Sequence, residues 1–292
     1  MGIIKAAKLA FDYLRYDEDG NVEDTQRAVD GVDLDIQPGE FVAVLGHNGS
    51  GKSTFAKHIN ALLLPTEGTI WIDGIDTAKE PELWKVRQKA GMVFQNPDNQ
   101  IVTDKVWHEL AFGLESLGYD NATIRLRVAE MASYFGIHRW FYREVKELSG
   151  GQKQLLNLAA IMAMHPSLLI LDEPTSQLDP IAASDFLETV KKINRDIGTT
   201  VIITEHRLQD IIPFADKVFV MDQGKLITEG TPGEIGLELK RREHGMFLSM
   251  PVPMQIFASV DSDLACPLTV SDGRMWMQEY LNLHPEVVRG TE

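Results

Sequence analysis

The chain has 292 residues, of which 44% are hydrophobic and 24% charged, the composition of a globular protein with a substantial core. Its net charge of −15 disfavours nonspecific binding to nucleic acid or anionic lipid, and its single cysteine excludes an internal disulfide and indicates a reducing compartment. No apolar run is long enough to span a membrane and the N-terminus is too poor in apolar residues for a signal peptide, so we expect a soluble protein.

The first sixty residues are predicted to alternate strands with turns and to end in a helix. Residues 8–13 alternate as in a strand, and the acidic stretch 17–26 is predicted to be a turn-rich excursion before further strand-like alternation. Residues 41–45 form a short apolar run typical of a buried parallel strand. A helix is expected over about residues 53–64.

Strands and helices continue to alternate further along the chain. Residues 69–94 have the pattern of short strands with a small helix, and residues 104–165 are predicted to be mainly helical. Residues 168–171 and 199–204 are two more buried-strand patterns, and a last pair of strands is expected over about 217–229. This alternation predicts an α/β fold with a parallel sheet covered on both faces.

The alternation of strands and helices also divides the chain into a main domain, an inserted subdomain and a C-terminal extension. The helical block, at about residues 96–165, interrupts the alternation and is predicted to be an inserted subdomain. The main domain is expected to span residues 1–233. Residues 234–292 are expected to form a separate C-terminal extension with helical and extended parts.

One run fits the G-x-x-x-x-G-K-[ST] pattern of a phosphate-binding loop, and it consists of Gly46, His47, Asn48, Gly49, Ser50, Gly51, Lys52 and Ser53. Its glycines let backbone amides turn toward a phosphate, and the N-terminus of the following helix favours an anion. Lys52 is expected to reach the β- and γ-phosphates, and the Ser53 hydroxyl to ligate Mg²⁺. A glycine-rich turn without a ligand would not require this position between a buried strand and a helix.

The apolar run 168–171 ends in two acidic residues. The carboxyl ends of parallel strands line the ligand crevice of an α/β sheet. Asp172 is therefore expected to hold hydrated Mg²⁺, and Glu173 to orient or deprotonate the attacking water. The alternative is an exposed strand end before the turn at Pro174, which the phosphate-binding loop disfavours.

A second candidate phosphate-binding element lies at Leu148 to Gln152. Its Ser149 and Gln152 fit a capping box at the start of a helix. Glycines in the first turn of a helix cost stability, so Gly150 and Gly151 suggest that a phosphate approaches the backbone here. Two such elements in one short chain suggest that two chains share each nucleotide.

Taken in their order along the chain, these runs resemble the motifs of ABC-transporter ATPases. Leu148 to Gln152 is similar to their signature motif, Gln95 to the Q-loop glutamine, and His206 to the switch histidine. Asp179 lies in a run similar to the D-loop.

Tyr13 fits the aromatic residue that stacks on adenine in that family. Tyr16 is the alternative, because the acidic insertion that follows it makes the alignment ambiguous.

The resemblance implies a RecA-like P-loop NTPase core with a small antiparallel β-subdomain and an inserted helical subdomain. It implies ATP sites formed between two chains that face each other head to tail, with Ser149 and Gly151 at the γ-phosphate bound by the partner. The implied nucleotide-binding residues are Tyr13, Gly46, His47, Asn48, Gly49, Ser50, Gly51, Lys52, Ser53, Thr54, Ser149, Gly150, Gly151, Gln152 and Asp179. The implied catalytic residues are Lys52, Gln95, Glu173 and His206, and the implied Mg²⁺ ligands are Ser53, Gln95 and Asp172.

Further runs narrow the resemblance to the ATPases of energy-coupling factor (ECF) transporters, which import vitamins or transition-metal ions. They are residues 46–63, 94–100 and 108–113, together with the C-terminal extension, which in that family helps to hold two ATPases together. The chain departs from the family pattern in two places. Leu155 stands where an arginine is usual, and the switch histidine ends the run Thr-Glu-His where Thr-His is commoner.

The ECF resemblance implies an ATPase subunit at the cytoplasmic face of the cell membrane. Its implied partners are a second ATPase chain, a transmembrane coupling protein and a substrate-binding membrane subunit, with no nucleic acid. A heterodimer is favoured over a homodimer, and vitamin, cobalt and nickel all remain open as substrates.

This function has four alternatives. The first is an ATPase of another ABC transporter subfamily. The second is a soluble ABC ATPase of DNA repair, which would need long coiled-coil arms between Lys52 and Asp172. The third is a translation-type ABC protein, which would carry two ATPase units in one chain where this chain holds one set of motifs. The fourth is a nucleotide-gated scaffold without hydrolysis, which the presence of Glu173 and His206 disfavours.

Overall fold

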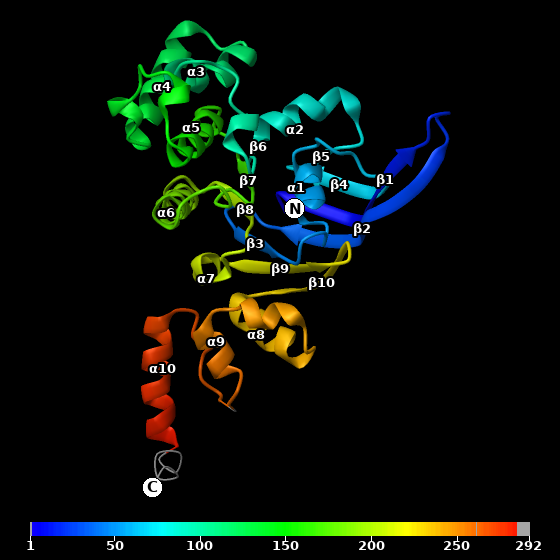
Figure 1. Cartoon of the computed structure of the whole chain (residues 1–292), viewed down its shortest axis with the longest axis vertical. Coiled ribbons are helices and arrows are strands. Elements are labelled where there is room, and N and C mark those ends of the chain that lie inside the picture. The colour runs from blue at the N-terminus through cyan, green and yellow to red at the C-terminus, as the bar shows by residue number, and fades with distance from the viewer. Residues whose placement is uncertain (1, 261, 285–292) are drawn as a thin grey trace.

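The computed structural model describes residues 2–260 and 262–284. Its helices α3, α4 and α5 form a block at one end of the molecule, the two sheets lie in the middle, and the C-terminal helices lie at the other end (Figure 1). No helix in the described ranges has both the length and the apolar character needed to cross a bilayer.

The central sheet has six strands in the order β10-β9-β3-β8-β7-β6. They are β3 (Phe41–Leu45), β6 (Ala90–Val93), β7 (Leu168–Asp172), β8 (Thr200–Thr204), β9 (Lys217–Asp222) and β10 (Lys225–Gly230). Neighbouring strands are parallel except β10, which runs antiparallel to β9. The predicted α/β class with a parallel sheet is confirmed.

The core explains why these strands are continuously apolar. Every residue of β3, β7 and β8 is buried. Along β3, Val42 and Val44 contribute to one hydrophobic cluster, shared with α1 and the second sheet, and Ala43 and Leu45 contribute to the other, shared with the helical block. Both faces of the strand are thus covered, so the residues that point to either face are apolar.

A second, antiparallel sheet has the order β2-β1-β4-β5. Its strands are β1 (Ile4–Tyr16), β2 (Val22–Ile36), β4 (Glu67–Ile72) and β5 (Ile75–Asp76). Strand β1 pairs with β2 as far as Tyr16 and Val22, so the prediction of a turn-rich excursion over residues 17–26 is wrong for its second half. The end of this hairpin is exposed on both faces, so it lacks the apolar alternation that marks a strand.

The described residues form ten α-helices. They are α1 (Lys52–Ile59), α2 (Leu83–Lys89), α3 (Val106–Ser116), α4 (Asn121–Tyr134), α5 (Gly150–Ala163), α6 (Pro180–Ile197), α7 (Leu208–Ile211), α8 (Pro232–Arg241), α9 (Val252–Phe257) and α10 (Val270–Leu283). Helix α1 ends five residues before the expected Leu64. At that point the Asn60 side chain turns to donate a hydrogen bond to the Ala90 carbonyl, and Ala61 takes a left-handed φ of 55°.

The C-terminal extension contains α8, α9 and α10 and a short 3-10 helix between α8 and α9, while its described residues 262–269 form neither helix nor strand. Helix α8 begins at Pro232, so its first turn contains the domain boundary expected at residue 233. Helix α8 packs on the edge strand β10, while α9 and α10 pack on each other beyond it (Figure 1).

Candidate active site

The phosphate-binding loop lies between β3 and α1. Lys52 donates hydrogen bonds from Nζ to the carbonyls of Gly46 (2.9 Å) and His47 (3.1 Å), which folds its side chain back over the loop. Gly51 has a φ of 101°, and a Cβ there would lie 2.4 Å from the Ala28 carbonyl oxygen. Only glycine fits that position, so the loop keeps its backbone amides open to a ligand.

Lys52 is a buried cation whose direct partners are main-chain carbonyls. Burial lowers the pKa of Lys52 from its usual value, and the negative charges of Glu173 and Asp172 oppose this. A phosphate at the loop would give the ammonium group the anionic partner that the protein alone does not place beside it.

A cavity of about 380 Å³ opens over the loop. Its lining residues are Tyr13, Gln26, Arg27, Ala28, Asn48, Gly49, Ser50, Gly51, Lys52, Ser53, Thr54 and Glu173. The Tyr13 hydroxyl lies 3.3 Å from the Thr54 hydroxyl, and the Tyr13 ring packs edge-on against Phe11. Tyr16 lies three residues further out on the hairpin and does not line the cavity, so the geometry favours Tyr13 as the residue that stacks on adenine.

Two of the three residues expected to hold Mg²⁺, Ser53 and Asp172, are already in contact, while Gln95 bonds Glu173. The Ser53 hydroxyl donates to Oδ1 of Asp172 at 2.9 Å, and the Thr204 hydroxyl donates to the same oxygen at 2.9 Å. A hydroxyl and a carboxylate are hard oxygen donors, and Mg²⁺ in phosphate sites usually takes one or two such protein ligands with water and phosphate oxygens. The donor set therefore fits Mg²⁺.

Glu173 lies between two of the other three predicted catalytic side chains, those of Gln95 and His206. Nε2 of Gln95 donates to one carboxylate oxygen of Glu173 at 3.1 Å, and Nε2 of His206 lies 2.9 Å from the other. Gln95 follows β6, Glu173 follows β7 and His206 follows β8, three adjacent strands of the parallel sheet. The sheet topology thus brings together residues that lie 78 and 33 positions apart in the chain.

The run at the start of α5 lies in a different place. The capping box is confirmed, because the Gln152 amide donates to Ser149 Oγ and the Ser149 amide donates to the Gln152 side chain. Ser149, Gly151 and Gln152 line a second cavity, with residues of α6, and are absent from the lining of the first. Within one chain, the structure does not bring this run to the phosphate-binding loop.

The glycines of this run lie close to α6 and to the run before it that is similar to the D-loop. A Cβ on Gly151 would lie 3.0 Å from that of Ala182 in α6, and one on Gly150 would lie 4.0 Å from the Gln177 carbonyl. Asp179 caps α6 by accepting hydrogen bonds from the amides of Ile181 and Ala182. Gly151 therefore has a packing role in addition to its predicted place beside a phosphate.

Sequence reasoning missed several polar neighbours of the site. Thr204 holds Asp172 from the end of β8, and Gln26 and Arg27 line the cavity from β2. Hydrogen bonds to Asp12 and Glu67 raise the pKa of Arg27 above its usual value and fix its guanidinium group. A threonine at the carboxyl end of a buried strand was the signal available for Thr204; we see none for Arg27.

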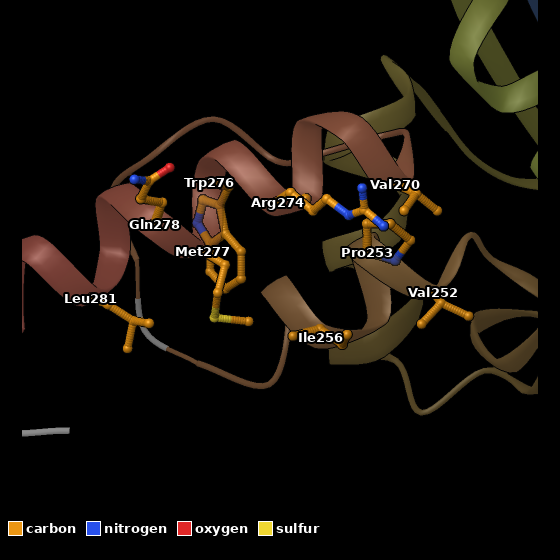
Figure 2. A pocket seen from close by; sticks show the side chains of 10 residues that line it. Val252, Pro253, Ile256, Val270, Arg274, Trp276, Met277, Gln278 and Leu281 are labelled. Atoms are coloured by element: carbon orange, nitrogen blue, oxygen red, sulfur yellow. The ribbon is translucent and has the colours of Figure 1, made fainter. Parts of the chain in front are cut away.

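A separate apolar cavity of about 500 Å³ lies in the C-terminal extension, between α9 and α10. Figure 2 shows the side chains of Ile256 and Met277 on opposite sides of it, with Trp276 beside Met277 and Arg274 nearer Pro253. Val252 and Val270 line it and are 61% and 64% exposed. A soluble domain seldom leaves so many apolar side chains at one opening unless another surface covers them.

Comparison with known proteins places this geometry in a family. The ABC transporter family model matches residues 29–176. The energy-coupling factor transporter ATP-binding protein EcfA1 of Clostridium novyi is 46% identical over 233 residues, which are 80% of this chain and 81% of that one. EcfA1 of Symbiobacterium thermophilum is 46% identical over 238 residues, 82% of each chain.

Solved structures agree with the sequence comparisons. CbiO1 of Clostridium perfringens, described as part of the ABC transporter complex CbiONQ, superposes with a TM-score of 0.71 at 33% identity and covers 88% of this chain and 98% of its own. A dimeric ATP-binding cassette in a post-hydrolysis state with ADP and phosphate superposes with a TM-score of 0.68 at 29% identity, over 78% of this chain and 98% of its own. The chain belongs to the ABC transporter family and, within it, to the ATP-hydrolysing subunits of energy-coupling factor importers.

Proposed function

We propose that this ATPase works as one half of a pair, in which two chains face each other head to tail and share two nucleotides. Two observations support the proposal. The phosphate-binding loop and the signature run line separate cavities of the same chain, so one chain does not complete a site by itself. The similar cassette solved with ADP and phosphate is dimeric.

Each residue of the site then has a distinct part in hydrolysis. Lys52 and the loop amides bind the β- and γ-phosphates, and Tyr13 stacks on adenine. Mg²⁺, held by Ser53 and Asp172 and by the amide oxygen of Gln95, would supply charge that offsets the negative charge developing on the phosphates.

Three further side chains act on the attacking water and on the γ-phosphate. Glu173 orients or deprotonates the water, and His206 contacts the γ-phosphate. Ser149 of the partner completes the site. Water other than the nucleophile is excluded when the pair closes.

The contact of Glu173 with Gln95 and His206 carries the proposal of hydrolysis, because it places a carboxylate between two polar groups at the mouth of the nucleotide cavity. Glu173→Gln should bind ATP normally and hydrolyse it about a hundredfold more slowly in the assembled transporter. Glu188→Gln, on the exposed face of α6, is the matched control and should retain full turnover. Near wild-type turnover of Glu173→Gln would contradict the role of Glu173.

Closure and reopening of the pair would drive transport. ATP can favour the closed pair only through its stronger binding to that state, and hydrolysis removes the γ-phosphate contacts that hold it. Gln95 lies where the core meets the helical block, so its contact with Glu173 can pass the nucleotide state to a membrane partner.

The C-terminal extension, residues 234–292, is proposed to hold the two ATPases together. Its apolar cavity between α9 and α10 offers the exposed side chains of Val252, Ile256 and Val270 to a partner (Figure 2). Contact through this extension would keep the chains paired while their nucleotide sites open.

The remaining partners are proposed from the relatives. The CbiO1 relative is part of a multi-subunit ABC transporter complex. We infer that this chain lies at the cytoplasmic face of the cell membrane, bound to a transmembrane coupling protein and, through it, to a substrate-binding membrane subunit. A related but distinct second ATPase is favoured over a homodimer, and the cargo is a vitamin or a transition-metal ion. Purification of the complex from membranes, with its subunits identified by mass spectrometry, tests each of these partners.

A further inference from the structure

A buried carboxylate lies immediately behind the catalytic cluster and has no part in the mechanism above. Glu205 follows β8, directly before His206, and is 4% exposed. Its Oε1 accepts hydrogen bonds from the backbone amide of Thr175 (2.9 Å) and from the Thr175 hydroxyl. Its Oε2 accepts a hydrogen bond from the backbone amide of His206 at 3.0 Å.

These bonds join two loops of different strands. Thr175 is 1% exposed and lies in the loop that runs from Glu173, at the end of β7, to Asp179, at the start of α6. His206 begins the loop after β8. The Glu205 carboxylate therefore joins Thr175, directly before the run at Ser176 to Asp179 that is similar to the D-loop, to the main chain of the predicted switch histidine.

The chemistry of this bridge explains why a carboxylate is needed. A buried carboxylate is costly unless donors satisfy it, and here two amides and one hydroxyl do so. An ionised carboxylate only accepts hydrogen bonds, so both of its oxygens can face N–H or O–H donors at once. The shorter threonine expected at this position in the commoner Thr-His pattern offers a single oxygen and cannot reach both loops.

We propose that Glu205 is a positioning residue that couples the D-loop to His206. The proposal rests on the two-chain function above, in which the signature run meets the partner, and the D-loop run lies beside it, since a Cβ on Gly150 would lie 4.0 Å from the Gln177 carbonyl. A shift of the D-loop on docking would move Thr175, and the bridge would carry that movement to His206, whose Nε2 lies 2.9 Å from Glu173. Glu205 would thus align the γ-phosphate contact only when the partner is in place.

Two substitutions break the bridge with little change of volume. Glu205→Gln keeps the length of the side chain, but its NH₂ group must face either the Thr175 or the His206 amide, and two donors cannot bond each other. Thr175→Val removes the hydroxyl donor and keeps the branched shape. Thr200→Val is the matched control, because Thr200 is also buried, lies at the opposite end of β8, and has a hydroxyl that accepts a hydrogen bond from the Gly39 amide.

The test measures kcat and KM for ATP in the assembled transporter, together with ATP affinity of the isolated chain and thermal unfolding. Glu205→Gln and Thr175→Val should lower kcat by roughly tenfold, with KM and ATP affinity unchanged. Thr200→Val should lose a similar amount of thermal stability and keep its kcat. A kcat that stays at the wild-type value in both bridge variants, or that falls equally in Thr200→Val, would overturn the proposal.

A double-mutant cycle separates coupling through His206 from a general loss of structure. If Glu205 acts through His206, then adding Glu205→Gln to a His206→Ala chain should lower kcat no further. If the two substitutions instead lower kcat by the product of their separate effects, the proposal is overturned. The wild-type and Thr200→Val complexes both keep the bridge. If they did not hydrolyse ATP, the proposed function would be contradicted and the bridge would not.

Discussion

Single residues of the site are placed by the ends of neighbouring strands. The phosphate-binding loop follows β3, and Gln95, Glu173 and His206 follow β6, β7 and β8. The parallel arrangement brings all of these ends to one edge of the sheet, where side chains converge without any long excursion of the backbone. Hydrogen bonds then orient the groups, with Glu173 held from both sides.

The aromatic contact to adenine gives a prediction at this scale. Tyr13→Ala should weaken ATP binding by about 1–3 kcal/mol, the range measured when base–aromatic stacking is removed. Tyr16→Ala is the matched control and should bind as the wild type does, because Tyr16 does not line the cavity. Calorimetric titration of both variants with ATP measures the difference, and the reverse order of affinities would assign the contact to Tyr16.

Several residues of the site could be predicted from the sequence because each is tied to a pattern with its own physical cause. The glycines and lysine of the loop and the acidic pair after a buried strand are of this kind. Glu205 could not be found in this way, since its importance depends on Thr175, 30 positions earlier, and only the packing of the two loops shows their contact.

Among the elements, α5 connects the site to the helical block. Nε2 of the fully buried Gln154 donates to the carbonyls of Phe94 and Pro174, both at 3.0 Å. Phe94 precedes Gln95 in the chain, and Pro174 follows Glu173. One side chain of α5 therefore anchors the backbone beside two of the proposed catalytic residues.

Removal of this anchor should be costly to stability. Gln154→Met keeps the approximate volume and leaves the buried Pro174 carbonyl and the partly buried Phe94 carbonyl without their donor, so the free energy of unfolding should fall by about 1–3 kcal/mol. Gln209→Met, on the exposed side of α7, should change it by less than about 0.5 kcal/mol. Urea unfolding of both variants makes the comparison. Equal effects would show that the Gln154 bonds add no stability.

The ends of elements were harder to predict than their order. The sequence predicts the succession of strands and helices because the buried runs are continuous. The hairpin beyond Tyr13 was missed because its exposed faces carry no apolar alternation, and the early end of α1 depends on a tertiary hydrogen bond from Asn60 to β6.

At the scale of the whole molecule, the proposed function depends on a second chain. The nucleotide cavity lies over the core, the signature run lies at the start of α5, and the apolar cavity lies at the far C-terminal end. The proposed pair would therefore meet at two separate surfaces, one that closes on ATP and one in the extension that stays joined.

The second surface can be tested with a charge. Val270→Asp places a carboxylate at the first turn of α10, where a helix tolerates it, and at the opening of the apolar cavity, where a partner's apolar surface would not. It should weaken association of the two ATPases roughly tenfold without changing ATP binding. Val22→Asp, at the exposed end of the β1–β2 hairpin, is the matched control. Sedimentation that shows equal association for both variants would exclude α10 from the interface.

The sharing of each nucleotide by two chains is the central claim, and Ser149→Arg tests it most directly. The large side chain would stand at the start of α5, remote from the nucleotide cavity of its own chain. The measurement is ATP turnover by the assembled transporter beside ATP affinity of the isolated chain. The two-chain site predicts that turnover falls by roughly a hundredfold while ATP affinity stays at the wild-type value. Turnover and affinity that fall together would contradict it.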